Sequence, residues 1–96
     1  MNLYFRSIRY GEGRLVIQVA AVEALSNYRL ALTFNTGERR CFDMRLYLRY
    51  PVFRRLEQPA FFGLARVDYG TVTWPGEIDI APETLYERSV PADAGA

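Results

Sequence analysis

The carboxylates are the strongest candidates for catalytic groups in this sequence. Two or more carboxylates held close together can carry acid–base catalysis or bind a divalent cation. The chain has no His, so the commonest general base and metal ligand is missing. Isolated carboxylates more often cap turns and complement helix N-termini, and we therefore predict a protein that is not an enzyme and holds neither metal nor cofactor. The carboxylates that a fold could bring together are Asp43, Asp68, Asp79 and Glu83.

Nucleophilic chemistry also lacks its usual partners. Cys41 is the single cysteine and stands next to Phe42 in an alternating stretch, so we interpret it as a small hydrophobic side chain rather than a nucleophile. One cysteine allows no internal disulfide and fits the reducing cytoplasm. No apolar run approaches the roughly 20 residues that cross a bilayer, and the N-terminus lacks the pattern of a signal peptide. We predict a cytoplasmic protein without membrane contact.

Arginines gather in the middle of the chain. All twelve basic residues are Arg, and residues 39–55 contain six of them with aromatic residues interleaved. Such a segment can hold phosphates and stack bases, but it can equally be a solvated face or the docking surface for an acidic partner. Because the formal net charge is only +1, we rank a protein partner above nucleic acid. For the nucleic-acid alternative the candidate phosphate contacts are Arg39, Arg40, Arg54 and Arg55.

Length and composition predict one small α+β domain. Ninety-six residues, half of them apolar, suffice for one hydrophobic core. A domain of this size buries roughly 60 to 65% of its unfolded surface, so a partner or a second copy could add stability. We predict a small antiparallel sheet of meandering hairpins with one or two short helices on it. The domain should span residues 1–88, with an additional hairpin over residues 1–18 and a flexible tail over residues 89–96.

The first half of the chain alternates as β-strands do. Residues 14–24 read as one strand that is apolar on both faces, with Leu15, Ile17, Val19 and Ala21 sharing one of them. A hairpin follows in which residues 28–34 and 38–44 pair across a turn. Gly37 can take the positive φ that this turn requires.

Prolines and glycines divide the second half. Helical spacing of Leu46, Tyr50 and Phe53 favours a short helix that begins near Pro51. We predict a loose turn over 45–49, a helix over 51–57 that Pro59 stops, strands over 61–69, 71–74 and 78–80, and a helical turn from Pro82.

Two interpretations of residues 71–89 are open. In the structural one, Trp74 lies over the core with its indole N–H hydrogen-bonded, Ile78 and Ile80 point inward, and Leu85 with Tyr86 covers the sheet. In the functional one, the same stretch forms a partner-binding surface. The residues that would carry the second role are Trp74, Asp79 and Tyr86.

Several of these motifs resemble a known bacterial family. They are the Leu-x-Leu-x-Phe strand with Gly37 and Phe42-Asp43, the Val52-Phe53-x-x-Leu56 segment, and Trp74-Pro75 followed by Asp79 and Pro82-Glu83-Thr84-Leu85-Tyr86. Together they are similar, over about residues 19–88, to the family catalogued as domain of unknown function number 2442. Family members commonly read Trp-Pro-Asn-Gly at the turn, whereas Gly76-Glu77 follows Pro75 here.

The resemblance implies a small α+β protein without a described activity. Genes of the family often stand beside another small family of suspected toxin-like behaviour, and some members carry a fused helix-turn-helix domain. We do not expect such a domain after residue 88. The leading hypothesis is therefore a small non-enzymatic protein-interaction module, an antitoxin-like partner of another small bacterial protein. The alternative is a nucleic-acid-binding module that uses the Arg-rich segment 39–55.

Self-association is a further expectation. The strand over 14–24 is apolar on both faces, and Leu3, Phe5 and Ile8 add alternating apolar residues before it. Edges and faces of this kind are either protected or used for pairing. We therefore predict a homodimer whose interface centres on residues 3–22.

Overall fold

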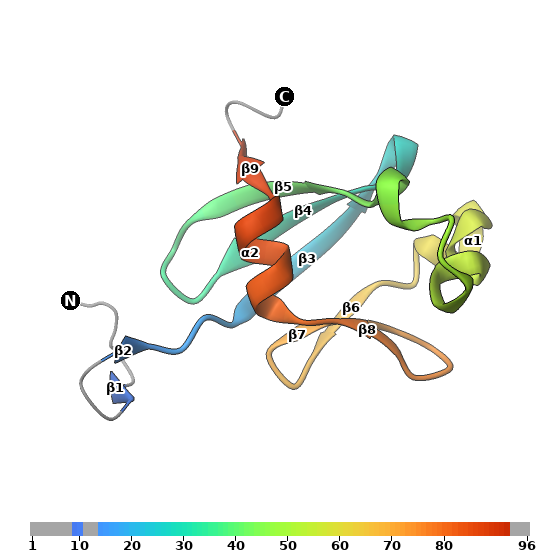
Figure 1. Cartoon of the computed structure of the whole chain (residues 1–96). Helices are drawn as coiled ribbons and strands as arrows, with labels where there is room; N and C mark the ends of the chain where they lie inside the picture. Colours follow the sequence, from blue (N-terminus) through green and yellow to red (C-terminus); the bar gives the residue numbers. More distant parts are fainter. Residues whose placement is uncertain (1–8, 11–13, 93–96) are drawn as a thin grey trace.

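The computed structural model describes residues 9–10 and 14–92, and its strands form three antiparallel sheets (Figure 1). A ribbon of β1 and β2 precedes a four-stranded sheet in the order β3-β4-β5-β9 and a three-stranded sheet in the order β6-β7-β8. The predicted α+β class with antiparallel hairpins is thus confirmed. The strands are β1 (Arg9–Tyr10), β2 (Arg14–Leu15), β3 (Val19–Leu25), β4 (Arg29–Phe34), β5 (Arg39–Asp43), β6 (Arg66–Asp68), β7 (Thr71–Trp74), β8 (Ile78–Ile80) and β9 (Val90–Pro91).

The helices are all short. Of those within residues 9–10 and 14–92, two are α-helical, and α2 crosses one face of the four-stranded sheet (Figure 1). No helix in the described residues is long and apolar enough to cross a membrane. The helical elements are η1 (Ser26–Tyr28), η2 (Met44–Tyr47), η3 (Pro51–Glu57), α1 (Pro59–Phe62) and α2 (Pro82–Arg88), where η denotes 3-10 geometry.

The β4–β5 hairpin agrees closely with the sequence pattern. Alternate residues of β4 are buried, and Gly37 takes a φ of 92° in the connecting turn. Tyr28, predicted as the first strand residue, instead lies in η1, where it and Asn27 both have positive φ. Its ring packs edge-on against Phe62 and its hydroxyl donates to the carbonyl of Glu57, and these contacts hold an uncommon backbone conformation.

The strand predicted over residues 14–24 is divided. Asn35 causes the break. Its side chain accepts a hydrogen bond from the N–H of Gln18 (3.1 Å) and donates one to the carbonyl of Val16 (2.6 Å). These backbone groups therefore bond to the Asn35 side chain instead of to a neighbouring strand. A register irregularity between Val19 and Ala21 then reverses the alternation. Val19 is buried but Ala21 is exposed, so the predicted common face of these two residues is wrong.

Pro59 was predicted to end a helix, but it begins α1 instead. It occupies the first turn of α1, a position at which proline is favoured. The strand predicted over 61–69 is therefore shortened to β6, because Phe62 belongs to α1 and is buried against Trp74, with ring centres 6.0 Å apart.

The chain also remains ordered into the sheet beyond residue 88. Ser89 is buried, and Val90 and Pro91 pair with Cys41 and Arg40 of β5. Residues 89–91 are thus part of the fold and not of a flexible tail, whereas residues 93–96 lie outside the described part.

One core joins both larger sheets. β4 and β5 contribute the inward side chains of one layer, and β7 and β8 contribute those of the other, while α1, α2 and η3 close the sides. The side chains with less than 2% exposure are Trp74, Phe34, Phe42, Leu30, Leu32, Met44, Leu56, Leu85 and Val72.

Candidate interaction site

The three residues of the predicted partner-binding surface do not form one surface. Trp74 is 1% exposed and its indole N–H donates to the carbonyl of Phe62 at 2.9 Å, as the structural interpretation predicted. Asp79 points outward from β8, between the buried Ile78 and Ile80. Tyr86 lies half-buried on α2, where it faces the β4–β5 hairpin.

The four arginines of the phosphate hypothesis have separate surroundings. Arg39 and Arg40 are neighbours on β5 and point to opposite faces of the sheet. Arg39 is exposed, whereas Arg40 is enclosed beneath α2. Arg54 and Arg55 are exposed on η3, and the guanidinium carbon of Arg55 lies 4.5 Å from the centre of the Phe61 ring. The structure does not bring these four side chains into one site.

The carboxylates also divide between regions. Asp68 and Asp79 share an open cleft of about 380 Å³ with Arg66 and Glu77 on the three-stranded sheet. Asp43 lies elsewhere, paired with Arg45. Among the described residues no group of three or more His, Cys, Asp or Glu side chains is placed to hold a metal ion.

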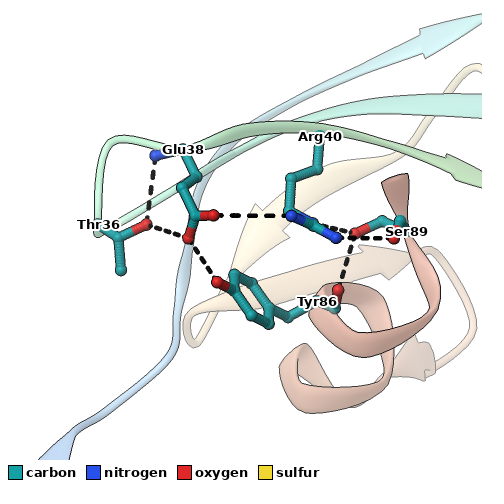
Figure 2. Close-up of polar contacts among 5 residues, drawn as sticks. All are labelled: Thr36, Glu38, Arg40, Tyr86 and Ser89. Atoms are coloured by element: carbon teal, nitrogen blue, oxygen red, sulfur yellow. Dashed lines mark hydrogen bonds and ion pairs between the residues drawn. The ribbon is translucent and has the colours of Figure 1, made fainter. Parts of the chain in front are cut away.

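A polar cluster fixes α2 to the β4–β5 hairpin (Figure 2). The guanidinium of Arg40 donates to Ser89 Oγ at 2.7 Å and to the Ser89 carbonyl at 2.8 Å, and it lies 3.6 Å from a carboxylate oxygen of Glu38. Glu38 accepts from the hydroxyls of Tyr86 (2.6 Å) and Thr36 (3.1 Å). We call Thr36, Glu38, Arg40, Tyr86 and Ser89 the Arg40 cluster. It joins residues 36–40 to residues 86–89 with charge-assisted hydrogen bonds, which are stronger than neutral ones.

The pKa of Tyr86 reflects its contacts within the Arg40 cluster. Its hydroxyl donates to the Glu38 carboxylate, and this hydrogen bond, together with partial burial, raises the pKa of Tyr86 above its ordinary value. The nearby Arg40 guanidinium acts in the opposite direction but is the smaller influence. The arrangement keeps the phenol protonated, which suits a donor that holds two elements together.

A second surface, beside α2, combines exposed apolar, aromatic and cationic groups. Leu46 is 73% exposed and Tyr50 is 45% exposed. The guanidinium carbon of Arg49 lies 5.4 Å from the centre of the Tyr50 ring, within the range of cation–π attraction. These side chains line an open cleft of about 410 Å³, which we call the Arg49–Tyr50 surface. Its residues are Leu46, Tyr47, Arg49, Tyr50, Thr84, Glu87 and Arg88.

Local structure holds the η2 side of this surface in place. Asp43 accepts from the backbone N–H of Arg45 at 2.9 Å and so caps η2. The Arg45 guanidinium binds the same carboxylate with both ends of its fork (3.0 and 2.7 Å) and lowers the pKa of Asp43. Tyr47 then stacks on the buried Phe42 with ring centres 5.4 Å apart. The surface is therefore anchored to the core through Tyr47.

The α2 side of the surface was missed from the sequence. Thr84, Glu87 and Arg88 stand at positions i, i+3 and i+4, which place them on one face of a helix. That spacing was a usable signal. Nothing local, however, indicated that this face would lie beside Leu46 and Tyr50, almost forty residues earlier in the chain.

Comparisons with known proteins agree with this fold. Residues 19–91 match the model of a family described as protein of unknown function (DUF2442). The chain is also similar to the crystal structure of the putative DNA-binding protein NE0471 from Nitrosomonas europaea, with a TM-score of 0.69 and 29% sequence identity. That match covers 83% of this chain and 52% of the other, so this chain spans about half the length of its structural relative. No curated protein matches the chain.

Proposed function

We propose that this chain, which belongs to the DUF2442 family of proteins of unknown function, is a protein-interaction module that binds its partner through the Arg49–Tyr50 surface. It is not an enzyme in this proposal. The observation that carries it is the exposure of Leu46 and Tyr50 beside Arg49, in a cleft that also borders α2.

The composition of the surface supports binding to protein. Tyr and Arg are the residue types that most often supply large shares of binding energy at protein interfaces. A side chain such as Leu46, exposed over 73% of its area, is a natural anchor for an apolar group of the partner. Tyr47 lines the same cleft and is held by its stacking contact with Phe42. A side chain that is already held loses less entropy on binding.

Charge indicates the chemistry of the partner. Arg49 and Arg88 both line the cleft, and Glu87 is its only acidic lining residue. A partner segment with one apolar side chain flanked by carboxylates would meet Leu46 and the two guanidinium groups together. Such complementarity mainly improves specificity and the rate of association.

More specifically, we propose that the protein has an antitoxin-like role in the bacterial cytoplasm. It is supported by the gene neighbourhood implied by the family resemblance, in which a second small family stands beside this one. Co-expression with the neighbouring gene product is the appropriate test. Rescue of growth from that product by the wild-type chain, but not by an Arg49→Glu/Tyr50→Ala variant, is the expected result.

Nucleic-acid binding is the second candidate function. It is favoured by the description of the Nitrosomonas europaea relative as a putative DNA-binding protein, although about half of that protein lies outside the match. Arg49, Arg88 and the Tyr50 ring could contact phosphates and a base. Phosphate binding by several arginines would make the affinity fall steeply with added salt.

Titration with labelled single- and double-stranded oligonucleotides separates the two functions. We expect only weak, non-specific binding near physiological salt. A submicromolar complex lost on changing Arg39, Arg54 and Arg55 to Gln, or Arg49 and Arg88 to Gln, would favour the second candidate. Arg40 is left intact in both variants because it holds α2 in place.

A further inference from the structure

A tyrosine stands at the tip of the β6–β7 hairpin in a backbone conformation that tyrosine rarely adopts. Tyr69 and Gly70 connect the two strands, and their φ angles are 54° and 76°. A two-residue turn with positive φ at both positions favours Asn-Gly, because Asn tolerates this region far better than a bulky aromatic residue does. The Tyr69 side chain is also 93% exposed. Neither the turn nor the core therefore accounts for a tyrosine at this position.

The rest of the domain holds this turn in place. The Gly70 carbonyl accepts a hydrogen bond from the backbone N–H of Val19 at 2.8 Å. On its other side Gly70 is so close to Gln18 that an added Cβ would lie 3.1 Å from that side chain. The backbone that carries Tyr69 is thus docked against the start of β3. A fixed backbone reduces the entropy that is lost when its side chain binds a partner.

Tyr69 borders the cleft of about 380 Å³ on the outer face of the three-stranded sheet. Arg66, Thr73 and Asp79 stand in one row across this face, because Thr73 pairs with both of its neighbours. The Thr73 Oγ1 atom is shielded from solvent, and no described residue gives it a hydrogen-bond partner. The row therefore has an unsatisfied hydroxyl at its centre.

Charge identifies the kind of ligand that the cleft accepts. Three carboxylates line it against one guanidinium, that of Arg66, so two negative charges are in excess. Arg66 lies 3.9 Å from the Asp68 carboxylate, whereas Glu77 and Asp79 form no ion pair within the described part of the chain. This excess repels phosphates and attracts cations. An exposed aromatic ring beside carboxylates lets cation–π attraction and ion pairing act on the same cation.

We propose that this cleft binds an arginine side chain from a basic segment of a partner protein. The guanidinium would lie over the Tyr69 ring and donate to the carboxylates of Glu77 and Asp79. A guanidinium suits these groups better than an ammonium does, because it stacks on a ring and donates within its plane at the same time. The Arg49–Tyr50 surface has the opposite charge and so takes a different partner, and either proposal can fail without the other. The dimer interface predicted over residues 3–22 is separate from this cleft and lies mostly outside the described residues or on β1 and β2.

NMR titration of the full chain with the end-blocked peptide Gly-Arg-Gly-Arg-Gly tests the proposal. We expect the backbone amide signals of residues 66–69 and 77–79 to shift, and the affinity to fall with added salt because the contacts are ionic. The same peptide with Lys in place of Arg should bind about threefold or more weakly. The peptide with Glu in place of Arg should leave these signals unchanged.

Tyr69→Asn separates binding from folding. Asn suits the positive φ of the turn, so this variant should unfold at a higher temperature than the wild type. It should nevertheless bind the arginine peptide about fivefold or more weakly, because the ring is lost. Tyr69→Phe retains both the ring and the unfavourable backbone conformation, and it should therefore change neither property.

Glu77→Asn/Asp79→Asn tests the carboxylates. Asn also tolerates the φ of 64° at residue 77, so the fold should be retained while the affinity falls by about tenfold or more. Glu23→Gln/Glu57→Gln removes the same charge at exposed positions outside the cleft and should leave the affinity unchanged.

Three results would overturn the proposal. The first is an arginine peptide that shifts no signal of the cleft. The second is full affinity in Tyr69→Asn or in Glu77→Asn/Asp79→Asn. The third is a shift of the cleft signals with protein concentration alone, which would identify a second copy of this chain as the occupant.

Discussion

The guanidinium carbon of Arg40 lies 4.8 Å from the centre of the Tyr86 ring, and both side chains contact Glu38. Arg40 comes from the core-facing side of β5, a position at which a charged residue is usually excluded. It is tolerated because Ser89, Glu38 and the Tyr86 ring satisfy it together. These contacts hold α2 in place, and with it the α2 side of the Arg49–Tyr50 surface.

Replacement of Arg40 should therefore destabilise the protein. Arg40→Met keeps the length of the side chain but removes its hydrogen bonds to Ser89, and we expect a loss of about 1 to 3 kcal/mol in the free energy of unfolding. Arg39→Met, on the exposed side of the same strand, should change it by less than about 0.5 kcal/mol. Urea denaturation of the two variants compares them directly, and equal effects would contradict the assigned role of Arg40.

Tyr86 should make stability depend on pH in the alkaline range. Its pKa is raised in the folded state, so the fold binds the phenolic proton more tightly than the unfolded chain does. The corresponding stability is complete below the unfolded pKa, about 10, and is lost as pH rises through the raised folded value. The stability difference between wild type and Tyr86→Phe should shrink over that range. A difference that stays constant from pH 8 upward would show that the Glu38 contact does not govern this titration.

The fold was predictable from the sequence where contacts are local. Alternation predicted the β4–β5 hairpin. Of the two interpretations that the sequence left open for Trp74, burial in the core is the one that the structure shows, because an aromatic residue in an apolar alternating stretch has few alternatives to the core. The break before β3 was not predictable, since it depends on the Asn35 side chain reaching residues 16–18 across a turn. The site was harder still: Arg40 shares its face with Phe42, but Tyr86 and Ser89 are more than forty residues away.

The Trp74 side chain should contribute a large part of the stability. Trp74→Ala removes a fully buried ring and should cost about 3 to 5 kcal/mol. Trp74→Phe retains much of the packing against Phe62 but removes the indole N–H that donates to the Phe62 carbonyl. That carbonyl keeps the backbone N–H of Ala65 as a donor at 3.2 Å, so the expected cost is about 0.5 to 1.5 kcal/mol. Thermal denaturation checks both values, and an unchanged midpoint for the alanine variant would show that the ring is exposed.

Two glycines should respond in opposite ways to alanine. At Gly37 a Cβ would meet no atom within 4 Å, but φ is 92°, so Gly37→Ala should destabilise through backbone strain by about 1 to 2 kcal/mol. At Gly63 the backbone is helical with a φ of −66°, and a Cβ would make only ordinary contacts. Gly63→Ala should therefore be neutral or stabilise by about 0.4 to 1 kcal/mol. Chemical denaturation of the pair measures this contrast, which would vanish if residue 37 could relax to a negative φ.

The proposed function is tested most directly by comparing two double variants in partner binding. Arg49→Glu/Tyr50→Ala alters the Arg49–Tyr50 surface, and Arg66→Glu/Tyr69→Ala makes the same changes at the cleft on the three-stranded sheet, where Tyr69 is 93% exposed. Each variant and the wild type are used for affinity capture from the native host, and the dissociation constant of the recovered partner is then measured by calorimetry. We predict that the wild type and the control bind the same protein equally, while Arg49→Glu/Tyr50→Ala binds it at least about tenfold more weakly. Undiminished binding by Arg49→Glu/Tyr50→Ala, or recovery of nucleic acid without any protein, would contradict the proposed function.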